Sequence, residues 1–258
     1  MALTVVSLGS SFAAGPLIPP VVDPDAGRSG RNYPSLVAAR LGADLVDLTV
    51  SGATTATILD EPQTTMSGKV YGPQIEGVPR HADVVTITAG GNDLDYTASM
   101  LFAAFRRLDP AHPISRFLAD RFPDGLQEPS GAMVSAAESR LVRIVEGVCA
   151  RTDDARIVLV DYLTVIGGGT SGGTLFDGAE RDLLHGMRTS LEAAHERAAE
   201  QSGAELLRVS ALSRDHGLDS PEPWVTGLLT KPALSAGSFH PNALGMERVA
   251  EELVRLLA

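Results

Sequence analysis

The sequence predicts an α/β domain in which a mostly parallel sheet is covered by helices on both faces. Two observations carry this prediction. Short runs of β-branched and apolar residues recur along the 258-residue chain, and segments with apolar residues at intervals of three and four lie between them. Strands that alternate with helices form parallel sheets buried on both sides. We therefore expect a single domain over residues 1–258, because a chain of this length can bury one α/β core.

Five segments are predicted to be the strands of this sheet. Each is a short apolar or β-branched run, and the first three end in loops that contain glycine. They cover residues 3–8, 44–50, 82–89, 156–163 and 205–209. Because the carboxyl ends of parallel strands meet at one edge, we expect the chemistry-bearing loops to gather there.

Amphipathic spacing predicts the main helices. They begin near residue 33, run over 133–150 and 177–201, and resume at Pro241, where a proline suits the first turn of a helix. The stretches rich in Gly and Pro or without periodicity, residues 15–31, 108–131 and 210–239, are expected to be irregular loops.

Composition excludes several classes of function. A net charge of −11 argues against nucleic acid as a partner, because phosphate binding needs an excess of Lys and Arg. The histidines and the lone Cys149 show no paired metal-ligand spacing, and the glycines match no nucleotide-binding pattern, so we expect no metal and no cofactor. Cys149 is expected to be a small buried hydrophobe of a helix.

Targeting signals are not evident in the sequence. No apolar run is long enough to span a bilayer, and no leader precedes the first strand. We therefore expect a cytoplasmic monomer without a stable membrane anchor, or a secreted protein if a leader was removed.

Two serines follow the first predicted strand. Ser10 and Ser11 stand at its carboxyl end, before a run of small residues that lets a substrate approach the backbone. This placement suits a nucleophile. The alternative is that the two hydroxyls simply cap the next helix.

The second and third strands end in candidate donors for an oxyanion. Gly52 follows the second strand, and the sequence Gly-Gly-Asn-Asp over residues 90–93 follows the third. A glycine N–H and the side-chain amide of Asn92 can stabilise a tetrahedral transition state together with the N–H of the nucleophile. The alternative for residues 90–93 is an ordinary turn.

One of the six histidines is placed to act as a base. His240 lies in a loop after the last strand, directly before the helix start at Pro241. His185 and His195 fall instead within a predicted helix, where a solvated face is the simpler interpretation.

With these residues in this order, the chain resembles the GDSL-type esterases and lipases, also called SGNH hydrolases. Four ordered blocks carry the resemblance, namely residues 9–12, Gly52, residues 90–93 and His240. The resemblance implies a flavodoxin-like three-layer sandwich with a central parallel five-stranded sheet. It also implies Ser11 as nucleophile, His240 as general base, and an oxyanion hole from the N–H groups of Ser11 and Gly52 with the side chain of Asn92.

The sequence departs from the family pattern at two positions. Ser10 replaces the aspartate of the first block, and Gly237 stands where the family usually has the aspartate that orients the histidine. Some members use a main-chain carbonyl instead, so we expect the carbonyl of Gly237, or a neighbour within 235–238, to accept a hydrogen bond from His240. The alternative is a carboxylate from Asp215 or Asp219.

The substrate is expected to be a small-molecule ester or a lipid. We assign Trp224, Phe12 and Leu94 to the substrate pocket, and we expect the apolar run over residues 100–105 to line an acyl groove. The alternatives are a carbohydrate O-deacetylase of the same fold and a non-catalytic binding module, which the missing aspartate makes conceivable.

Overall fold

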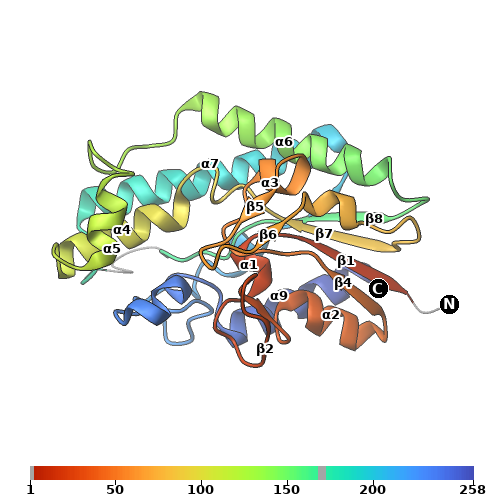
Figure 1. Cartoon of the computed structure of the whole chain (residues 1–258), viewed down its shortest axis with the longest axis horizontal. Helices are drawn as coiled ribbons and strands as arrows, with labels where there is room; N and C mark the ends of the chain where they lie inside the picture. Colours follow the sequence, from red (N-terminus) through yellow and green to blue (C-terminus); the bar gives the residue numbers. More distant parts are fainter. Residues whose placement is uncertain (1–2, 168–172) are drawn as a thin grey trace.

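The computed structural model of the chain describes residues 3–167 and 173–258 and is built around one parallel five-stranded sheet. The strand order is β4-β1-β7-β8-β9 (Figure 1), which is the flavodoxin-like order 2-1-3-4-5. The prediction of the fold class is confirmed. The five strands are β1 (Thr4–Gly9), β4 (Asp44–Asp47), β7 (Val84–Thr88), β8 (Arg156–Val160) and β9 (Glu205–Leu207).

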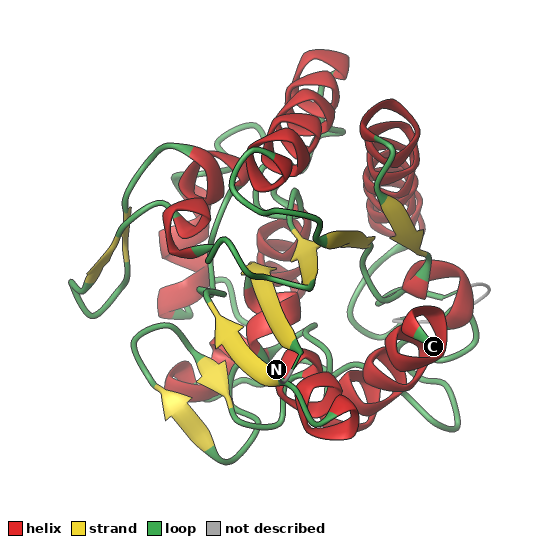
Figure 2. Ribbon diagram, turned by 90° about the vertical axis from the view of Figure 1, so that its right-hand side faces the viewer, coloured by secondary structure: helices red, strands yellow, loops and turns green. Residues whose placement is uncertain are grey.

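Helices cover both faces of this sheet. Figure 1 shows one group of helices above the strands and another below them. The upper group includes α3 (Thr55–Leu59), α6 (Gly131–Cys149) and α7 (Gly178–Ser202), and the lower group includes α2 (Tyr33–Leu41) and α9 (Ala243–Leu257). Figure 2 shows the strands running between these two groups of helices.

The alternation of side chains along β8 divides the core between the two faces. Ile157 and Leu159 pack in one hydrophobic cluster, with residues of α6. Val158 and Val160 pack in the other, with residues of α2 and α9. Successive side chains of a strand point to opposite faces, so the four residues Ile157–Val160 are apolar in succession because β8 is covered on both sides.

The position of β1 between β4 and β7 decides where the functional loops meet. β1 pairs with β4 on one side and with β7 on the other, all in parallel. Ser7 lies opposite Asp47, and Gly9 lies opposite Thr88, so the three strands end close together at one edge. The loops that follow β4, β1 and β7 are therefore neighbours.

Some segments that were expected to be irregular contain regular structure. Helix α5 (Pro113–Ala119) lies within residues 108–131, where His112 caps it and Pro113 occupies the first turn. Within residues 15–31, β2 (Val21–Asp23) pairs with β3 (Arg28–Ser29). A second small hairpin joins β5 (Gln63–Thr64) to β6 (Val70–Tyr71), and the remaining short elements are α1 (Ser11–Ala14), α8 (Val209–Leu212), η1 (Gln74–Gly77) and η2 (Pro232–Gly237).

Cys149 is exposed, so the expectation that it is buried was wrong. Val148 already completes the buried stripe of α6, and the helix ends at Cys149. Within residues 3–167 and 173–258, no helix combines the length and apolar character needed to cross a bilayer. The same described residues contain no group of three or more His, Cys, Asp or Glu side chains that is suited to a metal ion.

Candidate active site

The chain turns sharply after β1 and places Ser11 at the carboxyl edge of the sheet. Ser10 is extended, and its N–H donates to the carbonyl of Thr88 at 3.0 Å. Gly9 passes so close to β7 that a Cβ there would lie 2.6 Å from the same carbonyl oxygen. Ser11 is the first residue of α1, so the helix makes no use of its N–H. The turn therefore presents a hydroxyl and an amide hydrogen side by side.

His240 contacts Ser11 across 229 positions of sequence. Its Nε2 lies 2.7 Å from the Ser11 Oγ, and its Nδ1 lies 2.8 Å from the carbonyl oxygen of Ser238. Because a carbonyl oxygen only accepts hydrogen bonds, Nδ1 carries the ring hydrogen, and Nε2 is left to accept from the serine hydroxyl. This is the tautomer in which a histidine can remove the proton of a serine.

The orienting carbonyl belongs to Ser238, which corrects the prediction that named Gly237. Ser238 lies within residues 235–238, the range that was predicted as the alternative to Gly237. Phe239 has a left-handed backbone with a φ of 60°, so the chain reverses between Ser238 and His240 and brings this carbonyl to the imidazole. Gly237 instead ends η2.

The carboxylates proposed as alternatives do not hold the imidazole. Nδ1 has one hydrogen, and the Ser238 carbonyl accepts it, which leaves none for Asp215 or Asp219. Both aspartates are exposed in the loop after α8. In the same loop, Nδ1 of His216 donates to the Glu222 carbonyl at 2.9 Å.

Burial controls the charge of His240. Only 5% of the residue is exposed, and the Phe12 ring centroid lies 5.3 Å from that of the imidazole. Desolvation lowers the pKa of His240 from 6.5 to about 4, and the hydrogen bond to the Ser238 carbonyl opposes the shift only in part. The imidazole is therefore neutral near pH 7, the form that accepts a proton.

Gly52 occupies a fixed turn beside the serine turn. Its φ of 82° is left-handed, a conformation that glycine adopts without a steric cost. The preceding residue is held from two sides, because the Ser51 N–H donates to the Ala26 carbonyl and the Ser51 carbonyl accepts from Nε2 of Gln63, each at 2.8 Å. Gly52 itself is exposed. Its peptide is thus positioned at the surface next to the end of β1.

The loop after β7 is tied to the loop after β4. Asn92 donates from Nδ2 to the Ala53 carbonyl at 2.8 Å. The Asp93 carboxylate accepts from the Thr55 N–H at 3.0 Å and from the Thr55 hydroxyl at 2.5 Å. An asparagine amide has two hydrogens, so one hydrogen of Asn92 orients the group and the second stays available for a ligand.

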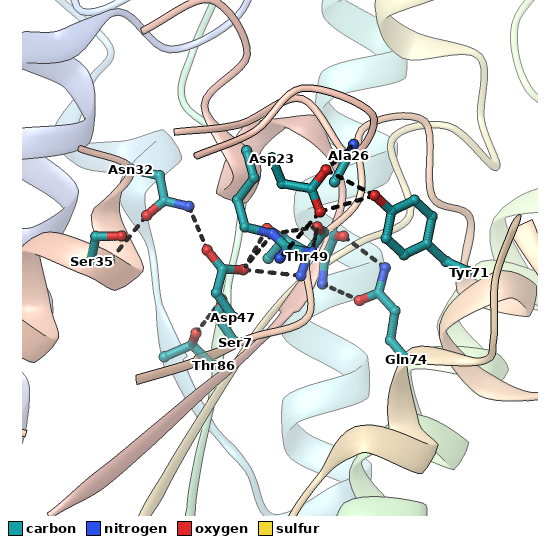
Figure 3. Close-up of polar contacts among 12 residues, drawn as sticks. Ser7, Asp23, Ala26, Asn32, Ser35, Asp47, Thr49, Tyr71, Gln74 and Thr86 are labelled. Atoms are coloured by element: carbon teal, nitrogen blue, oxygen red, sulfur yellow. Dashed lines mark hydrogen bonds and ion pairs between the residues drawn. The ribbon is translucent and has the colours of Figure 1, made fainter. Parts of the chain in front are cut away.

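Polar side chains fix the chain between β4 and Gly52 (Figure 3). Asp47 accepts from the Thr49 N–H at 3.0 Å and from Nδ2 of Asn32 at 2.8 Å. Arg28 donates to the Thr49 carbonyl through Nε at 3.0 Å and Nη2 at 2.8 Å. These bonds set the path on which the chain reaches Gly52.

Sequence reasoning missed Gln74, which clamps the end of β1. Its Oε1 accepts from the Gly9 N–H at 2.8 Å, and its Nε2 donates to the Gly9 carbonyl at 3.0 Å (Figure 3). Gln74 is 5% exposed and comes from η1, 65 residues away in sequence. A single glutamine in a loop gives no sequence signal for this role. The clamp holds the peptide that lies two residues before Ser11.

Replacement of Gln74 by leucine is expected to destabilise the protein. The variant leaves the buried Gly9 N–H without its acceptor, which costs about 1–3 kcal/mol of unfolding free energy. Thermal and denaturant unfolding measure the change. Gln201→Leu is the matched control, because Gln201 is exposed on α7 and its side chain donates to Glu138 of α6 and not to the backbone of β1. Equal stability of the two variants would contradict the clamp.

The three residues assigned to the substrate pocket occupy different surroundings. Leu94 lines a cavity of about 330 Å³ between the start of α4 (Tyr96–Leu108) and the loop before α6. Phe12 is 4% exposed and packs at 4.6 Å from Tyr162. Trp224 stacks on His216 at 4.1 Å, with 10° between the rings. Leu94 alone of the three lines this cavity.

The run over residues 100–105 lies in the core. Met100, Ala103 and Phe105 have no exposed surface, because α4 packs against α5 and α7. The expectation that this segment lines an acyl groove was wrong. An apolar run that is buried on several sides of a helix has the same composition as a groove wall.

The fold and the site together define an acylhydrolase. A neutral histidine is in contact with a serine hydroxyl, and backbone and amide donors lie on the two neighbouring strand ends. These are the groups that acyl transfer needs.

The comparisons with known proteins identify the family. The model of the GDSL-like Lipase/Acylhydrolase family matches residues 7–248. Lipase 2 of Streptomyces coelicolor is 31% identical over an alignment of 264 positions, which covers 99% of this chain and 86% of that protein. The chain therefore belongs to the GDSL-like lipase/acylhydrolase family, and it is a carboxylic ester hydrolase.

Solved structures share the fold of this chain. The extracellular lipase of Streptomyces rimosus superposes with a TM-score of 0.70 at 21% identity, and the match covers 100% of both chains. Phospholipase A1 of Streptomyces albidoflavus superposes with a TM-score of 0.71 at 21% identity, over 96% of this chain and 95% of that one.

Proposed function

We propose that the chain hydrolyses carboxylic esters through an acyl-enzyme on Ser11. Nε2 of His240 takes the hydroxyl proton as Oγ bonds to the ester carbonyl carbon. The tetrahedral intermediate then breaks its C–O bond, and His240 gives the proton to the leaving alcohol. Water attacks the acyl-enzyme with His240 again as base, and the carboxylic acid leaves. The 2.7 Å contact between Nε2 and Oγ, in the correct tautomer, carries this proposal.

The oxyanion of that intermediate is assigned to three donors. They are the N–H groups of Ser11 and Gly52 and the second amide hydrogen of Asn92. The strand order supports the assignment, because β4 and β7 flank β1 and their loops are hydrogen bonded to each other. Donors fixed before the reaction stabilise the developing charge without reorganisation.

Esters of short and medium-chain acids are the substrates that we place first, with lipids next. Leu94, two residues beyond Asn92, lines a cavity of ligand size, which supports this choice. The support comes through Leu94 alone, because Ser11, Asn92 and His240 are not among the residues that line the cavity. The names of the relatives, a lipase and a phospholipase A1, agree with a lipid-type ester. Removal of acetyl groups from sugars is the competing activity.

Labelling with a fluorophosphonate probe and a panel of p-nitrophenyl alkanoates tests the proposal. Wild-type protein is expected to be labelled and to hydrolyse the esters, whereas Ser11→Ala does neither. Ser220→Ala is the control, because the buried Ser220 hydroxyl has no hydrogen-bond partner among the residues that the structure describes, so its removal breaks no hydrogen bond there. Folded wild-type protein that takes no label, or that cleaves acetylated sugars but no alkanoate, would overturn the proposal.

The acid limb of the activity profile is expected well below pH 6.5. The neutral imidazole is the base, so activity falls as pH decreases through the pKa of His240. Burial lowers that pKa to about 4, and kcat/KM should therefore persist to about pH 5. A kcat/KM profile on one ester checks this, and a midpoint at 6.5 or above would contradict it.

Stability must be measured over the same range. The expectation that His195 lies on a solvated face was wrong, because the residue is fully buried, and desolvation lowers its pKa to about 4 as well. Between about pH 4 and pH 6.5 these histidines are protonated in the unfolded chain but neutral in the folded chain. The free energy of unfolding therefore decreases as pH falls through this window. Circular dichroism at each pH separates loss of fold from loss of the base.

A further inference from the structure

Tyr162 lies where the serine turn and the asparagine loop meet. It follows β8 by two residues and is 3% exposed. Its hydroxyl oxygen is 3.2 Å from the Ser10 Oγ and 3.0 Å from the Gly91 nitrogen. One phenol oxygen thus contacts the residue before Ser11 and the residue before Asn92.

The direction of one of the two hydrogen bonds follows from the chemistry of the groups. The Gly91 N–H only donates, so the Tyr162 oxygen accepts from it. Between the Tyr162 and Ser10 hydroxyls either oxygen can be the donor, so the phenol hydrogen or the serine hydrogen joins them. Burial raises the pKa of Tyr162 to about 12, so the phenol keeps its hydrogen over the working range of pH.

The ring of Tyr162 is held on several sides, so the position of its hydroxyl is fixed. Phe12 packs at 4.6 Å between centroids, and Tyr96 and His195 contact the ring edge-on at 6.5 Å and 5.9 Å. Gly91 approaches so closely that a Cβ there would lie 2.6 Å from Cε1 of the tyrosine. A glycine at this position is what allows the phenol to reach the backbone.

Ser10 stands where related enzymes carry the aspartate of the first block. A serine cannot supply a carboxylate, yet the N–H of Gly91 still needs an acceptor because it is buried. The Tyr162 hydroxyl is that acceptor in this chain.

We propose that Tyr162 is a positioning residue, whose hydroxyl sets the spacing between the Ser11 turn and the Asn92 loop and so fixes the geometry of the oxyanion hole. The inference rests on the proposed function. Tyr162 touches neither Ser11 nor Asn92 through its two hydrogen bonds, so it acts through Ser10 and Gly91.

Tyr162→Phe tests the inference, because it keeps the ring and removes only the hydroxyl. We expect kcat to fall about tenfold to a hundredfold, as a misplaced reacting group does, while KM changes little. Transition-state stabilisation is lost and substrate binding is kept, so kcat and kcat/KM fall together.

Tyr33→Phe is the matched control. Tyr33 is equally buried, and its hydroxyl also makes two contacts, with the hydroxyls of Thr86 and Thr88, below the sheet. A purely structural role predicts similar losses of thermal stability and little change in kcat for both variants. Loss of kcat confined to Tyr162→Phe supports positioning, and equal kcat values for the two variants overturn it.

Ser10→Ala keeps the inference open to refutation if Tyr162→Phe does not fold. This variant removes one of the two contacts of the phenol and leaves the bond from Gly91, so a smaller, several-fold loss of kcat is expected. An unchanged kcat, or a rise in KM alone, overturns the inference. Failure of the proposed function has a different signature, because Ser11→Ala would then retain activity whatever Tyr162→Phe does.

Discussion

His240→Ala is expected to lower kcat by about 10⁶-fold, the largest effect of any substitution considered, because serine and histidine act as one unit. Without the imidazole, the Ser11 hydroxyl keeps its proton and is a poor nucleophile. Ser11→Ala should cost about as much, and the double variant should be no worse than either single one. The measurement is kcat on a p-nitrophenyl ester, with folding verified by circular dichroism.

The matched controls for this prediction are Asp215→Ala and Asp219→Asn. Nδ1 of His240 is bound by a carbonyl, so neither carboxylate is needed to orient the imidazole, and both variants should retain most of the activity. Loss of activity in a folded Asp215 or Asp219 variant to the level of His240→Ala would show that a carboxylate completes the site.

Asn92→Ala is expected to lower kcat by about 10²- to 10³-fold, the effect of removing one donor from an oxyanion hole. The amide contacts the negative charge only in the tetrahedral state, so KM should change little and kcat/KM should fall with kcat. Steady-state kinetics on the same ester checks this.

Asn92 also holds the loop at Ala53, and that second role needs a control. Gln63→Ala loosens the same loop from outside, because Gln63 donates to the Ser51 carbonyl and supplies no donor to the oxyanion in our assignment. Because Gln63 also holds Ser51 beside Gly52, the kcat of this variant should fall, but by much less than the loss of about 10²- to 10³-fold expected for Asn92→Ala. If Gln63→Ala were as impaired as Asn92→Ala, loop order and not charge stabilisation would explain the loss.

The sheet and the long helices were predictable because their residues obey local periodicity. β8 is apolar on both faces, and α6 keeps a stripe at intervals of three and four. Helix α4 was not predicted as such, since Met100 and Phe105 lie in one run of apolar residues that is buried on several sides. The short helix α5 was not predicted either, because it lies in a stretch rich in proline and glycine and begins at the cap formed by His112.

The residues of the candidate site differ in how much the sequence reveals of them. Ser11 and His240 could be named because they stand at the ends of predicted elements, and the structure brings them into contact. Gln74 and Tyr162 could not, because each reaches its partner across a long stretch of sequence, and nothing local marks a glutamine or a tyrosine for such a contact. The orienting carbonyl depended on the φ of Phe239, which the sequence does not encode in a recognisable pattern.

The separation of 229 positions between Ser11 and His240 has a consequence for biosynthesis. The proposed nucleophile leaves the ribosome early, whereas the proposed base lies shortly before α9, which packs against α2. Chains are made at about 5–20 residues per second, so a nascent chain carries Ser11 for many seconds without its partner. Under the proposed mechanism, a nascent chain therefore lacks its base until the segment that carries His240 has been made.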